Sequence, residues 1–80
     1  MFRYREIKAR VRKQPFVPLR IVTSAGEAFD IYHPDLIMVG RREVTIGQES
    51  SADPAIYDEV DRVSIMHITA IKDLPRRKRV

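Results

Sequence analysis

The stretch PLRIVTSAGEAFDIYHP, residues 18–34, limits what this chain can fold into more than any other segment. Apolar side chains occupy alternate positions on either side of a short polar run: Leu19, Ile21, Phe29 and Ile31. Alternation with a period of two is typical of β-strands that bury one face. The intervening TSAGE contains Gly26, a residue type that readily adopts the backbone angles of a tight turn. The stretch therefore predicts a β-hairpin.

The next segment, His33-Pro34-Asp35, interrupts the hairpin pattern. Proline cannot donate a backbone hydrogen bond to a sheet, so it indicates an edge, a bulge or a bend. After this interruption, LIMVG at residues 36–40 and REVTIG at residues 42–47 are two further β-rich runs, with GRR as the turn between them.

The second half of the chain predicts a long loop and a sharp corner. The polar run at residues 48–59 is expected to be a loop of about twelve residues, which is long for so small a domain. Residues 60–74, VDRVSIMHITAIKDL, exceed the length of an ordinary strand. We expect two short strands that meet at a tight bend near His67, or one strongly bent strand.

A short amphipathic helix is predicted at residues 2–13. Tyr4, Ile7 and Val11 recur at spacings of three and four, which places them on one helical face and leaves the cations on the rest. Gln14 precedes Pro15 and is therefore biased away from the helical conformation, so the helix should end before it.

These elements predict a mainly β (α+β) fold, with an N-terminal helix and a strongly bent, five-stranded antiparallel sheet. Residues 1–75 are expected to form one domain, and residues 76–80 a basic tail, because 80 residues support only one modest core. The alternating positions predict which side chains lie inside: Leu19, Ile21, Phe29, Ile31, Val44, Ile46, Val63 and Ile65.

Composition excludes several classes of protein. The hydrophobic fraction of 44% and the charged fraction of 32% are those of a folded, soluble domain. There is no cysteine, hence neither a disulfide framework nor a thiolate metal site, and this favours a cytoplasmic protein. No apolar run approaches the roughly 18 residues that a membrane span requires, and the N-terminal sequence lacks the apolar core of a signal peptide, so no membrane association is expected.

The order helix, hairpin, bend, strand, strand, variable loop, strand, corner and strand resembles the Sm-like small β-barrels, whose bacterial branch is the Hfq type. PLRIVTSAGEAFDI is similar to the first Sm motif, with a turn closed by Gly26 and an aromatic residue at Phe29, although Ala25 stands where the family usually has Asp or Asn. SIMHITAIKDLP is similar to the Hfq-type end, where His67 matches and Met66 replaces a lysine.

The resemblance implies an Sm-like barrel that assembles into rings by pairing of edge strands and binds RNA. An SH3-like barrel is the alternative for the same strands. The chain is also similar to small uncharacterised bacterial proteins with the pattern PF.P..I....G..Y.V.HP, which implies no function; the matching residues are Pro15, Phe16, Pro18, Ile21, Gly26, Ile31, His33 and Pro34.

Catalysis is not expected, because the sequence has no nucleophile motif, no phosphate-binding glycine loop and no HExxH pair. No cofactor or metal is predicted, since the aspartates are too irregularly spaced for a calcium loop. His33 is expected to shape a bend. His67, between two apolar residues, is interpreted either as a half-buried strand histidine or as an RNA contact.

The charge distribution favours a non-enzymatic module that binds nucleic acid, with RNA preferred over DNA. The net charge is +4, and cations gather near both ends of the chain. Such cations can neutralise phosphates, and Tyr4 could stack on a base, although a solvated helix face and a solubilising tail explain the same charges. The predicted contact residues are Arg3, Arg5, Lys8, Arg10, Arg12, His67, Arg76, Arg77, Lys78 and Arg79.

The alternative is a protein-interaction module or an accessory subunit of a larger complex. Residues 48–61 are acidic, and together with an exposed strand edge they could receive a protein partner. Because a small barrel leaves a strand edge that must be protected, we also expect a homo-oligomer formed by edge pairing.

Overall fold

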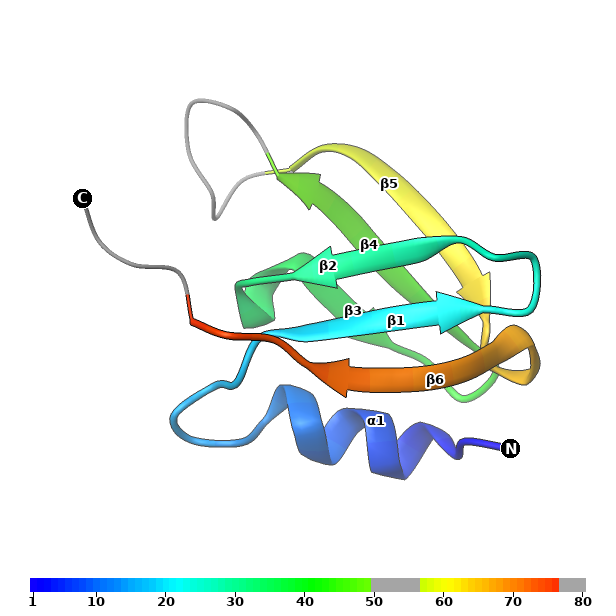
Figure 1. Cartoon of the computed structure of the whole chain (residues 1–80), viewed down its shortest axis with the longest axis horizontal. Coiled ribbons are helices and arrows are strands. Elements are labelled where there is room, and N and C mark those ends of the chain that lie inside the picture. The colour runs from blue at the N-terminus through cyan, green and yellow to red at the C-terminus, as the bar shows by residue number, and fades with distance from the viewer. Residues whose placement is uncertain (50–56, 77–80) are drawn as a thin grey trace.

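A computed structural model describes residues 1–49 and 57–76 of the chain, and these contain one α-helix, six strands and two short 3-10 helices (Figure 1). In chain order the elements are α1 (Tyr4–Val11), β1 (Leu19–Thr23), β2 (Ala28–Ile31), η1 (Pro34–Leu36), β3 (Ile37–Val39), β4 (Glu43–Glu49), β5 (Tyr57–Ser64), η2 (Ile65–His67) and β6 (Ile68–Asp73).

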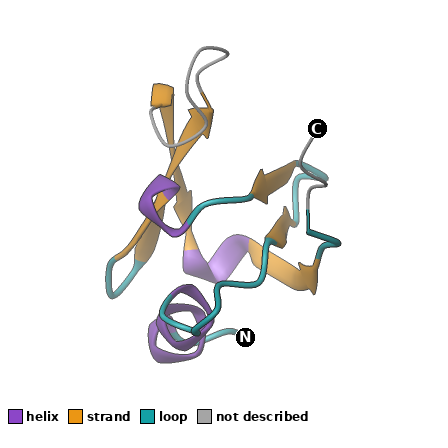
Figure 2. Cartoon of the chain, turned by 90° about the vertical axis from the view of Figure 1, so that its left-hand side faces the viewer, coloured by secondary structure: helices purple, strands orange, loops and turns teal. Residues whose placement is uncertain are grey.

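The strands form two antiparallel sheets of three strands each. One sheet has the order β2-β1-β6 and the other β3-β4-β5, and Figure 2 shows them as separate layers with α1 beside them. The prediction of a mainly β fold with an N-terminal helix is confirmed. The prediction of one five-stranded sheet bent into a barrel is wrong, because six strands are divided between two sheets that do not close.

The division between the sheets begins at the predicted interruption. Pro34 opens the 3-10 helix η1, and the His33 ring nitrogen Nδ1 accepts a hydrogen bond of 3.1 Å from the backbone N–H of Asp35. Because proline has no N–H to give to a ladder, β2 ends before this turn and β3 starts after it in the other sheet. The predicted bend at His33 is confirmed.

The predicted hairpin is confirmed in β1 and β2. Leu19 pairs with Ile31 and Ile21 with Phe29. Gly26 has a φ of 84°, in the region that favours glycine, and its N–H donates to the Thr23 carbonyl over 3.0 Å. The local sequence therefore sets both the alternation of the strands and the turn between them.

The predicted corner near His67 is also present. It is the 3-10 helix η2, after which β6 returns to pair with β1. The predicted loop is shorter than residues 48–59, since β4 continues to Glu49 and β5 begins at Tyr57. Residues 50–56 of that loop lie outside the described residues.

The core lies between the sheets and the helix. Seven of the eight side chains predicted to be inside are buried, and Phe29 is the exception. Phe29 is only partly buried because β2 is the outer strand of its sheet, so it packs against the rim of the core. Buried residues outside the predicted set are Ile7, Pro18, Thr23, Leu36, Ile37 and Ile68.

Helix α1 is shorter than predicted and begins and ends within residues 2–13. Glu6 Oε1 accepts a 3.1 Å hydrogen bond from the backbone N–H of Arg3, which caps the first turn. Ile7 is fully buried, and α1 packs against β3. An ion pair of 3.0 Å between Arg10 Nη1 and Asp73 Oδ1 joins the helix to β6, which lies beside it in Figure 1.

Candidate nucleic-acid interface

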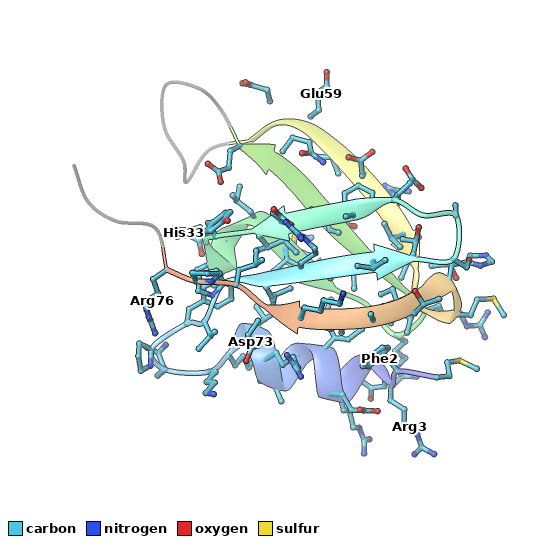
Figure 3. The ribbon with its side chains drawn as sticks, in the orientation of Figure 1. Phe2, Arg3, His33, Glu59, Asp73 and Arg76 are labelled. Atoms are coloured by element: carbon cyan, nitrogen blue, oxygen red, sulfur yellow. The ribbon has the colours of Figure 1, made fainter. Side chains whose placement is uncertain are left out.

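The cations at the start of the helix and Arg76 do not converge in space. In Figure 3, Phe2 and Arg3 lie at one end of the molecule, whereas Arg76 lies toward the other end, with Asp73 and His33. Three of the predicted contact residues lie outside the described residues: Arg77, Lys78 and Arg79. The described part of the chain therefore does not combine the start of the helix with Arg76 in one surface.

The predicted helix residues also have different surroundings. Arg3 and Arg5 lie at the start of α1 and are exposed, as is Arg12 at its end. Lys8 is half-buried, and Arg10 is held by the carboxylate of Asp73. A phosphate would have to compete with that carboxylate for Arg10, so the start of the helix is the better anion site.

Two arginines that sequence reasoning did not select extend this positive surface. Arg41 and Arg42 form the turn between β3 and β4, which the backbone hydrogen bond from Gly40 N–H to the Glu43 carbonyl closes at 2.8 Å. A second bond of 2.8 Å runs from Ile65 N–H to the Arg42 carbonyl and fixes the turn against η2. The sequence shows these two arginines in the run GRR, but it does not show that they lie near α1. That proximity depends on the packing between α1 and β3.

Four arginines from these two segments line a pocket of about 610 Å³, which we call the arginine pocket. This volume lies within the usual range of about 300–1,000 Å³ for ligand sites. The apolar part comes from the first residues of the chain and from η2. The full lining is Met1, Phe2, Arg3, Tyr4, Arg5, Arg41, Arg42, Ser64, Ile65 and Met66.

The arginine pocket combines an apolar surface with positive charge that no carboxylate of the described residues neutralises. Among residues 1–49 and 57–76, no ion pair involves the four arginines that line it. The Arg5 guanidinium lies 5.7 Å from the centre of the Tyr4 ring, and its Nε donates to the Tyr4 hydroxyl over 3.2 Å. This hydrogen bond raises the pKa of Arg5 above its ordinary value.

His67 lies next to this pocket rather than in it. It is exposed in η2, so the interpretation as a half-buried strand histidine is wrong. Its carbonyl accepts a 2.8 Å hydrogen bond from Ser24 N–H, and His67 lines a second pocket of about 350 Å³ that also includes Arg62. Ser64 lines both pockets, which places His67 close enough to extend a surface that begins at the arginines.

Other kinds of site find no support in the described residues. No group of three His, Cys, Asp or Glu side chains there could hold a metal ion. In the same residues, no helix has the length and apolar character needed to cross a membrane.

The geometry is that of a small two-sheet protein with a basic, partly apolar pocket at one end. Comparisons of the chain with models of protein families, with curated proteins and with solved structures find no match.

Proposed function

We propose that this protein is a non-enzymatic module that binds nucleic acid, with RNA preferred, and that the arginine pocket is its principal contact surface. The observation that carries the proposal is the meeting of Arg3 and Arg5 with Arg41 and Arg42 around one pocket. Guanidinium groups bind phosphate oxygens through charge-assisted hydrogen bonds, often two at a time. Four of them, without carboxylate partners among residues 1–49 and 57–76, form a surface suited to a phosphate backbone.

The apolar part of the pocket favours a single strand over a duplex. Phe2 and Tyr4 are half-buried aromatic residues at the same pocket, where an unpaired base can contact them. Stacking of bases on aromatic side chains tolerates many sequences, because every base has an aromatic face. We therefore propose electrostatic, sequence-tolerant binding, with His67 as a neighbouring contact.

The relation to Sm-like barrels is part of the same proposal. The support is the order of helix, hairpin, bend, strands and corner along this chain, which resembles the order of elements in Sm-like barrels. The open arrangement of two sheets means that this support comes from order alone. Assembly into a homo-oligomer likewise remains a proposal, for which the open strand edges are the physical reason.

The test is the salt dependence of binding to a single-stranded RNA. Replacing Arg3, Arg5, Arg41 and Arg42 together by Gln should flatten the slope of log K against log salt by about 2.8, because each lost contact contributes about 0.7 for a single strand. The slope is measured by fluorescence anisotropy over a series of salt concentrations, together with the circular dichroism of the variant.

A second fourfold variant controls for net charge. Arg12, Lys13, Lys72 and Arg76 are exposed cations outside the arginine pocket, and their replacement by Gln removes the same charge. This control should keep most of the slope. If both variants lose the same slope, binding is a general property of the charge and the proposed site is wrong; if neither the wild-type protein nor the control binds RNA at low salt, the proposed function is wrong.

A further inference from the structure

Strand β5 presents an open edge on the side of the molecule away from the helix. In the sheet order β3-β4-β5 it pairs with β4 alone, and no other strand of residues 1–49 and 57–76 continues the sheet beyond it. It is the longest strand described, Tyr57–Ser64, and Figure 1 shows it along the outer margin of the fold. A long open edge is a template for pairing with another extended chain.

The register shows which backbone groups of β5 point outward. Ile65 N–H donates to the Arg42 carbonyl, so this N–H points toward the start of β4. In an antiparallel pair, the residues that exchange hydrogen bonds with the neighbouring strand recur at every second position. Val63 therefore turns its N–H and carbonyl toward β4, in agreement with its pairing to that strand. Val60 and Arg62 turn theirs to the open side.

Three side chains along this edge are acidic, and Arg62 is the one cation among residues 58–64. Asp58 and Glu59 are exposed, and Figure 3 shows Glu59 projecting outward. Asp61 is half-buried and accepts a 2.7 Å hydrogen bond from Gln48 Nε2, which orients its carboxylate. Between the acids, Val60 keeps 46% of its surface exposed.

This charge pattern opposes pairing of β5 with the β5 strand of a second copy. Antiparallel pairing centred on Asp61 would place that residue opposite itself. Pairing centred on Val60 would place Glu59 opposite Asp61 twice, and its pairs of Asp58 with Arg62 would offset part of that repulsion. Like charges directly opposite each other destabilise a sheet. With three acids against one arginine, the edge is matched better by a basic strand than by a second copy of itself.

We propose that the open edge of β5 binds an extended basic segment of a protein partner by adding it to the sheet as a further antiparallel strand. The segment carries Lys or Arg opposite Glu59 and Asp61, and an apolar residue opposite Val60. Backbone hydrogen bonds provide affinity in this mode of recognition, and side chains provide specificity. The inference does not depend on nucleic-acid binding, since none of these residues lines the arginine pocket.

The probe is a capped peptide with Lys-Val-Lys at its centre, labelled for anisotropy, and the matched peptide has Glu-Val-Glu. We expect the Lys peptide to bind and the Glu peptide to bind at least about tenfold more weakly, because its charges repel those of the edge. Absence of binding by the Lys peptide, or equal binding by both peptides, overturns the proposal.

Backbone pairing is tested from the side of the peptide, which leaves the protein intact. A residue opposite Val60 must exchange hydrogen bonds with it, so N-methylation of the central Val should weaken binding about tenfold. The N–H groups of the two flanking Lys residues point away from β5, so N-methylation there should change little. Equal effects at both positions contradict strand addition.

Two protein variants complete the test. Val60→Pro removes an outward N–H at an edge, where proline is tolerated, and should weaken the Lys peptide about tenfold. Glu59→Lys should also weaken it, whereas Glu43→Lys, the same charge change on an exposed residue of β4, should not. Unchanged binding by both Val60→Pro and Glu59→Lys means that the peptide binds elsewhere and the proposal is wrong.

Discussion

At the scale of single residues, Ile7 attaches the helix to the rest of the molecule. It is the one fully buried side chain of α1, with 0% of its surface exposed. Ile7→Ala should lower the free energy of unfolding by about 2–4 kcal/mol, since it removes buried methyl groups and leaves a cavity. Urea denaturation measures the change.

The control for Ile7 is Met38→Ala. Met38 is 69% exposed, so its truncation should change the free energy of unfolding by less than about 0.5 kcal/mol. A loss below about 1 kcal/mol for Ile7→Ala would contradict the packing of α1 against the sheets, because a buried isoleucine rarely costs so little.

Gly26 provides a second test at this scale. Its φ of 84° is unfavourable for residues with a Cβ, while a Cβ built there would meet no atom within 4 Å. Gly26→Ala should therefore destabilise the protein by about 1 kcal/mol through backbone strain alone. Gly26→Asn should destabilise it less, because asparagine adopts positive φ more readily than alanine does. Thermal unfolding of the two variants checks the order, and a more stable Ala variant would contradict the strained turn.

At the scale of elements, the ion pair of Arg10 with Asp73 joins α1 to β6. The side chains are 43% and 67% exposed, so solvent weakens their attraction. A double-mutant cycle with Arg10→Gln and Asp73→Asn should give a coupling of about 0.2–1 kcal/mol that falls as salt is added. A coupling that salt does not change would mean that the pair is more deeply enclosed than the structure indicates.

The local elements and the hairpin of β1 with β2 could be predicted from the sequence, but the pairing of strands far apart in the chain could not. Alternation identified β1 and β2, and Pro34 identified the turn after them, because these signals act over a few residues. The pairing of β1 with β6 joins residues far apart in the chain, and no local sequence pattern indicates that these two strands are neighbours. For the same reason the sequence failed to divide the strands between two sheets.

For the candidate site, too, the local features could be predicted from the sequence and their meeting in space could not. The sequence showed the charges of Arg3 and Arg5 in the predicted helix. It also showed the charges of Arg41 and Arg42 in the predicted turn. Their meeting depends on the packing of α1 against β3 and on a backbone bond between the turn and η2. Only the folded chain supplies that information.

At the scale of the whole molecule, the separation of Arg3 from Arg76 limits what a short ligand can reach (Figure 3). Deletion of residues 76–80 should leave the affinity for an oligonucleotide of about four nucleotides unchanged, since that length is the lower end of a typical single-strand site. The same deletion should weaken binding of a longer RNA that can contact both ends. Calorimetric titration with both lengths checks this, and an equal loss for both would contradict a site centred on the arginine pocket.

Backbone hydrogen bonds join the connecting segments at the end of the molecule where the arginines lie. Ser24 N–H binds the carbonyl of His67, and Ile65 N–H binds the carbonyl of Arg42. These bonds use no side-chain atoms, so they do not depend on the exposed side chains that the turns carry, although Gly26 and the buried Ile65 are needed for other reasons. Mutation can therefore exchange the exposed side chains of this end at small cost to folding, which makes it a surface on which new specificities can evolve or be engineered.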